Sequence, residues 1–131
     1  MKNYVLVLLL FFSATGFAQQ NKVELLQKKL TSYFEEDTVK ALIYIDLADL
    51  LVFSEIDKSE GFAEKGLDLS KKLNWQRGIA ASYKSIGNVF FQRGSFVTAL
   101  ENWQQSLAIA EKENHMLLAA SVVGNIGLVY Q

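Results

Sequence analysis

The feature that most constrains the fold of this chain is an internal repeat with a period of 40 residues. The segment AASYKSIGNVF at residues 80–90 aligns with ASVVGNIGLVY at residues 120–130, and the Ile-Gly dipeptide at 86–87 falls on the one at 126–127. A weaker copy, offset by 39 residues, lies around Tyr44. Periods of this length are typical of chains in which one supersecondary unit stacks on the next.

The apolar residues of the middle copy predict that each unit consists of two helices. Tyr83, Ile86 and Phe90 recur at steps of three and four residues, which is the spacing of one face of an α-helix. Gly94 follows, and glycine readily adopts the left-handed conformation that ends helices. Ser95 is then expected to cap the next helix. The second helix is expected over residues 96–112, with an apolar face made of Phe96, Ala99, Leu100, Trp103, Leu107 and Ala110.

The helix boundaries of the other units follow from the same alignment. Asn114 is expected to end the second helix of the middle copy, as Asn74 ends its equivalent in the first copy. The segment DKSE at residues 57–60 has the pattern of a capping box, so a helix is expected to begin there. Residues 19–36 predict a leading amphipathic helix that covers the open end of the stack, with Val23, Leu26, Leu30 and Phe34 on one side.

Residues 1–18 have the pattern of a secretory signal peptide. Lys2 supplies a positive start, residues 4–12 (YVLVLLLFF) are uniformly apolar, and small residues precede an expected cleavage site after Ala18. The apolar run is shorter than the about 20 residues that cross a bilayer, and no Cys follows it to carry a lipid anchor. We therefore expect a protein exported to the periplasm or the extracellular face, without a membrane span.

The chain thus divides into a signal peptide, a leading helix and a repeat region. The repeat region at 37–131 contains a degenerate copy at 37–76, a clear copy at 77–115 and the first helix of an incomplete copy at 116–131. Because a half repeat cannot bury its apolar face alone, we expect further repeats or an output domain beyond Gln131.

These residues resemble the tetratricopeptide repeat family. That family has a bulky residue, Leu-Gly and Tyr in the first helix of each unit, and Ala followed by an aromatic residue in the second. The chain departs from the pattern in its longer repeat, in lacking Pro and in having Ala48 where the first copy would have Gly. The matching residues are Tyr83, Ile86, Gly87, Phe90, Gly94, Ala99 and Trp103 in the middle copy, and Ile126, Gly127 and Tyr130 in the last.

The resemblance implies an all-α fold, an antiparallel helix-pair solenoid wound into a right-handed superhelix. It also implies a scaffold that binds a protein or peptide on its concave face. The longer repeats resemble exported N-terminal regions of bacterial signalling proteins. An alternative function is therefore the extracytoplasmic sensor portion of a larger membrane protein, such as a histidine kinase or a nucleotide cyclase.

The concave face would be lined by the first helix of each unit. Lys84, Asn88 and Gln92 step by four residues on the side of that helix away from its apolar face, and Phe91 lies beside them. Asp49 occupies the position equivalent to Asn88 in the first copy. These five residues are the predicted peptide-binding site, although an ordinary solvated face remains the alternative interpretation.

The composition argues against other classes of function. The net charge is -1, which does not favour nucleic acid as a partner. The chain has no Cys and a single His, His115, which is expected to lie in a solvent-facing turn. Metal sites and nucleophilic triads need several such partners, and no glycine-rich phosphate loop is present. We therefore expect neither a cofactor nor an enzymatic activity.

Overall fold

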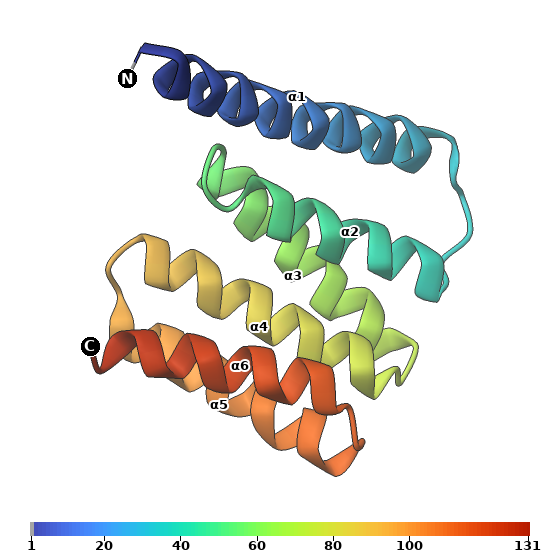
Figure 1. Ribbon diagram of the computed structural model, residues 1–131. Coiled ribbons are helices and arrows are strands. Elements are labelled where there is room, and N and C mark those ends of the chain that lie inside the picture. The colour runs from blue at the N-terminus through green and yellow to red at the C-terminus, as the bar shows by residue number, and fades with distance from the viewer. Residues whose placement is uncertain (1) are drawn as a thin grey trace.

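The computed structural model describes the backbone of residues 2–131 and the side chains of residues 15–131. This part of the chain is helical throughout and contains no strand (Figure 1), which confirms the predicted all-α class. The six helices are α1 (Lys2–Ser32), α2 (Thr38–Leu51), α3 (Ile56–Lys72), α4 (Gln76–Gln92), α5 (Phe96–Lys112) and α6 (Met116–Val129).

Each helix packs on the helix that precedes it, and successive helices run in opposite directions (Figure 1). The even-numbered helices also contact one another, because α4 packs against both α2 and α6. In the described residues α3 and α5 do not approach one another in the same way. The helices α2, α4 and α6 therefore form one row, in which side chains of different units can meet.

A single type of turn sets the regular spacing of the last four helices. These helices begin at Ile56, Gln76, Phe96 and Met116, 20 residues apart. The turns between them contain Asn74, Gly94 and Asn114, whose φ angles of 51°, 75° and 53° lie in the left-handed region. In each turn the next residue donates its N–H to a carbonyl five positions earlier, as in Ser95 to Phe90 at 2.9 Å, which is the Schellman pattern. The predicted roles of all three turn residues are confirmed.

Ser95 is the N-cap residue of α5, as predicted, but the capping box predicted at residues 57–60 is wrong. Ser95 precedes α5, but its side chain makes no capping hydrogen bond. The segment at residues 57–60 lies inside α3, whose N-cap is Glu55, also without a side-chain bond. Ser59 instead donates to the carbonyl of Ala48 at 2.7 Å, where it links α3 to α2. The Schellman turns before α4, α5 and α6 satisfy carbonyl groups at the end of the preceding helix, and no side-chain cap of the following helix accompanies them.

The leading helix differs from its predicted range. α1 ends at Ser32, so that Phe34 falls outside it and is 85% exposed instead of packing on one side. Much of the predicted signal peptide lies outside the residues whose side chains are described, so its cleavage stays a prediction. Within the described residues, no helix combines the length and the apolarity needed to cross a bilayer.

The core of the repeat region lies where the alignment places it. Trp103 is 1% exposed and Ala99 is fully buried. A Cβ atom on Gly87 would lie 2.4 Å from the indole of Trp103, so only glycine lets α4 and α5 approach this closely. Trp75 packs in its turn against Gly78, where an added Cβ would lie 2.1 Å from the ring. The small residues of the repeat are therefore contact points between helices.

Candidate functional site

The five residues of the predicted peptide-binding site gather around one groove with a volume of about 290 Å³. The groove lies along the row formed by α2, α4 and α6, where Asp49 comes from the first helix and Asn125 from the last. The sequence prediction therefore identified one contiguous surface. The complete lining is Asp49, Val52, Phe53, Lys84, Asn88, Phe91, Gln92, Trp103, Asn125 and Leu128.

The charged side chains of the groove neutralise one another. Lys84 Nζ lies 3.0 Å from Asp49 Oδ2, and the Ser85 hydroxyl donates to Asp49 Oδ1 at 2.6 Å. Both charged side chains are partly exposed, so this pair contributes modestly to stability. The contact joins α4 to α2. Lys84 and Asp49 therefore hold two units together and present no unbalanced charge to a ligand.

Asn88 also bonds within the protein. Its Oδ1 accepts the indole N–H of Trp103 at 3.1 Å and an amide N–H of Asn125 at 2.9 Å. The same indole N–H lies 3.2 Å from the carbonyl oxygen of Lys84. Asn88, predicted to bind a peptide, thus uses its side-chain oxygen within the protein. Its oxygen links α4 to α5 and α6, which leaves its Nδ2 group as the end that can face the groove.

The groups that remain open to a ligand are mostly apolar. Phe53 is 78% exposed and Leu128 is 49% exposed. Phe91 is partly buried, with its ring 5.5 Å from the rings of both Phe96 and Trp103. Gln92 is exposed, and its side chain makes no hydrogen bond to any residue whose side chain the structure describes. The repeat alignment also places Leu128 on this face, in the last copy. Sequence reasoning missed Phe53 and Asn125, because no periodic signal within one helix shows which residues of another helix lie beside it.

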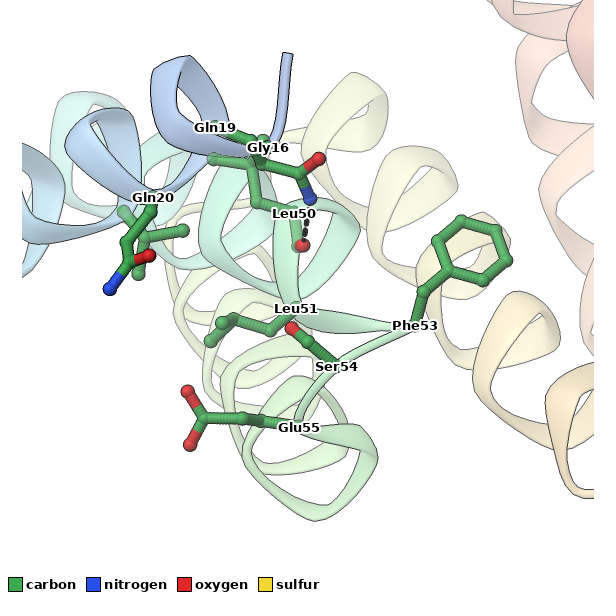
Figure 2. Close-up of a pocket in the computed structure, with 9 residues that line it drawn as sticks. Gly16, Gln19, Gln20, Leu50, Leu51, Phe53, Ser54 and Glu55 are labelled. Atoms are coloured by element: carbon green, nitrogen blue, oxygen red, sulfur yellow. Dashed lines mark hydrogen bonds between the residues drawn. The ribbon is translucent and has the colours of Figure 1, made fainter. Parts of the chain in front are cut away.

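A second and larger cavity, of about 470 Å³, lies between α1 and the C-terminal end of α2. Its lining includes Gly16, Gln20, Phe53 and Glu55, and Figure 2 shows Gln19 bonded across it. The side-chain amide of Gln19 donates to the carbonyl of Leu50 at 2.7 Å. Gly16 precedes the predicted cleavage site after Ala18, so cleavage there would remove part of this cavity wall. We therefore place the candidate site in the groove along α2, α4 and α6.

His115 does not lie in open solvent as predicted. It sits in the turn before α6 at intermediate exposure, and its Nδ1 atom is buried without a hydrogen-bond partner. In the part of the chain whose side chains are described, no group of His, Asp or Glu residues is placed to hold a metal ion. No family model, curated protein or solved structure matches this chain.

Proposed function

We propose that this chain is an interaction scaffold that binds an extended segment of another protein in the groove along α2, α4 and α6. The observation that carries the proposal is the composition of this groove. Exposed apolar side chains, Phe53 and Leu128, line the same groove as the amide groups of Asn88 and Gln92. Amide groups pair with peptide N–H and C=O groups, and apolar hollows take alternate side chains of a bound segment.

The internal pairing of Lys84 with Asp49 favours a segment without a net charge at its point of contact. A ligand carboxylate would have to compete with Asp49 for the only basic group in the groove lining. Desolvating such a charge without a free partner is costly. The preferred segment therefore has an apolar anchor side chain, seated near Phe91, between uncharged residues.

The regular 20-residue spacing of the last four helices and the row of α2, α4 and α6 support a tetratricopeptide-like stack as the architecture of the scaffold. We further propose that the scaffold acts outside the cytoplasm, because residues 1–18 have the pattern of an export signal. The stack is thus proposed from the helix arrangement and the repeat pattern, and the location from the sequence of residues 1–18. N-terminal sequencing of the exported protein tests the second, since cleavage is expected between Ala18 and Gln19.

The binding proposal is tested with a peptide library displayed on phage and selected on the intact chain. The enriched peptides are expected to share an apolar residue between uncharged neighbours. Replacing Phe53 by Ser and Gln92 by Ala together is expected to weaken their binding by at least about tenfold, as for other interface anchors. Both side chains are exposed, so the variant is expected to keep its fold.

The matched control for this variant is Phe34→Ser. Phe34 is 85% exposed and does not line the groove, so its replacement is expected to leave peptide binding unchanged. Selection of no peptide, or of peptides that bind the groove variant as tightly as the unaltered protein, would overturn the proposal.

A further inference from the structure

The turn between α2 and α3 is closed differently from the three turns that follow it. Of the described residues, only three have a left-handed backbone, and all of them lie in the later turns. In the first turn the carbonyl of Leu51 accepts two N–H bonds, from Ser54 at 3.1 Å and from Glu55 at 2.8 Å. In each Schellman turn the two corresponding N–H groups bond to different carbonyls. Within the described backbone, the carbonyl of Leu50 therefore receives no N–H group.

The donor to the Leu50 carbonyl comes from α1 instead. The side-chain amide of Gln19 bonds to this oxygen at 2.7 Å, and Figure 2 shows the bond crossing from α1 to α2. The carbonyl of Ser70, 20 residues after Leu50, receives the backbone N–H of Trp75 at 2.9 Å. Because carbonyls at a helix end need a partner from outside the helix, Gln19 satisfies at the end of α2 a position that the backbone satisfies in the later turns.

The first turn also carries Phe53, which lines both the groove and the cavity beneath α1. Figure 2 shows the Phe53 ring on the side of the turn away from α1. The ring is mostly exposed, so side-chain packing does little to fix it, and the backbone of the turn sets where it lies. The bond from Gln19 thus acts on the backbone that positions a groove residue.

The helix α1 has no direct part in the groove. No residue of α1 lines the groove, and among the described residues α1 packs against α2 alone. An effect of α1 on binding therefore has to pass through α2 and the turn at its end.

We infer that Gln19 is a positioning residue of the groove. Its bond to the Leu50 carbonyl holds the turn so that Phe53 stands at the edge of the groove, and release of α1 from α2 weakens binding there. This inference rests on the proposed binding function and names how that site is controlled. Gln19 directly follows the proposed cleavage site after Ala18, so that cleavage would keep it in the exported chain.

Amide hydrogen exchange, followed by NMR on the intact chain, tests the hold on the turn without any ligand. Gln19→Ala is expected to speed exchange at Ser54 and Glu55 at least about threefold, which corresponds to the loss of one modest hydrogen bond. Gln19→Glu keeps the shape of the side chain but has no N–H donor, so it is expected to behave like Gln19→Ala. Exchange at Asn74 is expected to stay unchanged, because its turn is closed by backbone bonds.

Gln20→Ala is the matched control for these variants. Gln20 is the next residue of α1, is exposed and lines the same cavity. Its side chain makes no hydrogen bond to any residue whose side chain the structure describes. Its replacement is therefore expected to leave exchange in the turn unchanged.

Peptides selected on the groove test the effect on binding. Gln19→Ala is expected to weaken their binding about threefold, measured by calorimetry, while Gln20→Ala leaves it unchanged. In a chain that already carries Phe53→Ser, Gln19→Ala is expected to cause no further loss, because the side chain that the bond positions is absent. A general loss of stability would instead weaken binding equally in both backgrounds.

Two results would overturn the inference and leave the proposed function standing. One is exchange at Ser54 and Glu55 that Gln19→Ala does not change. The other is a loss of binding from Gln19→Ala that is absent, or that is the same with and without Phe53, in peptides that still depend on the groove. Selection of no peptide would overturn the proposed function and the role of Gln19 in binding together.

Discussion

The two complete helix pairs, α2 with α3 and α4 with α5, differ in which helix carries the glycine at their closest contact. In the first pair the large residues lie on α2 and the glycine on α3, where a Cβ on Gly66 would lie 2.9 Å from Ile45 Cγ1. In the second pair the glycine lies on α4 and the large residue on α5, where a Cβ on Gly87 would lie 2.4 Å from the indole of Trp103. The position equivalent to Trp103 in the first pair is Ala63, which is fully buried.

This difference teaches that the repeat conserves the fit between the helices of a pair but not the side on which the large residue stands. Interiors are packed to the density of organic crystals, so a bulky residue on one helix requires a small one opposite. A comparison of aligned positions alone makes the first copy look degenerate, because Ala63 replaces an aromatic residue. The first pair instead has its close contact between Ile45 and Gly66, three residues from the buried Ala48 and Ala63 that hold the positions of Gly87 and Trp103.

The largest expected effect is the destabilisation caused by replacing Trp103, because this side chain packs α5 against α4 and does not belong to the first pair. Trp103→Ala removes a side chain that is 1% exposed and leaves a cavity beside Gly87. We expect the free energy of unfolding to fall by about 3–5 kcal/mol, measured by urea denaturation with circular dichroism. Trp75→Ala is the control, since Trp75 is only partly buried. An equal loss in both variants would contradict the central role of Trp103.

Adding one methyl group to each glycine is expected to have a smaller and unequal effect. Gly87→Ala drives a Cβ into a rigid buried indole, so we expect a loss of about 1–3 kcal/mol from overpacking. Gly66→Ala meets Ile45 Cγ1 and Ser82 Oγ, at 2.9 and 3.2 Å. The aliphatic side chain can shift, and alanine is favoured over glycine in a helix by about 1 kcal/mol, so we expect little net change.

Thermal unfolding of both glycine variants measures this asymmetry. Trp103→Leu is expected to suppress the cost of Gly87→Ala in a double-mutant cycle, because the two residues share one contact. The same Trp103 substitution is expected to leave the effect of Gly66→Ala unchanged, since Gly66 belongs to the other pair. A cost of Gly66→Ala equal to that of Gly87→Ala would contradict the comparison.

The sequence was sufficient to predict what depends on a single helix or turn. The periodic apolar residues predicted the helices, and Asn74, Gly94 and Asn114 predicted their ends, because left-handed residues are chemically distinctive. Gly87, which the alignment places in the repeat signature, lies where α4 and α5 approach closely. The five predicted site residues also line one groove, because they share a face of α4 or hold the equivalent position on α2.

What the sequence could not supply were the partners of side chains across units. Asn88 and Lys84 were expected to face a ligand, but their partners Asn125 and Asp49 are 37 and 35 residues away in the chain. Residues that far apart in the sequence come into contact only because α4 packs between α2 and α6. Ser95 lies at the predicted N-cap, but the sequence could not show that its side chain makes no capping bond.

The smallest expected effect is a pH-dependent change in stability, which arises at the first helix of the first pair. Asp37 caps α2, because its Oδ1 accepts the N–H of Lys40 at 3.1 Å and its Oδ2 accepts the hydroxyl of Tyr33 at 2.7 Å. The hydrogen bond from Tyr33, followed by the backbone bond from Lys40, holds the pKa of Asp37 below its ordinary value. The other pair has no such cap, since the side chain of Trp75 makes no capping bond to α4.

A carboxyl whose pKa is lower in the folded chain stabilises the fold above its unfolded pKa, and this stability is lost as the pH falls through the folded pKa. Asp37→Asn keeps a capping side chain but removes the charge, so we expect a slightly lower melting temperature at neutral pH. The difference from the unaltered protein is expected to shrink below about pH 3.9, when measured by thermal unfolding across the acid range. Asp46→Asn, at an exposed position of the same helix, controls for the loss of one negative charge. A difference for Asp37→Asn that stayed constant with pH would show that the ionised carboxylate does not stabilise the start of α2.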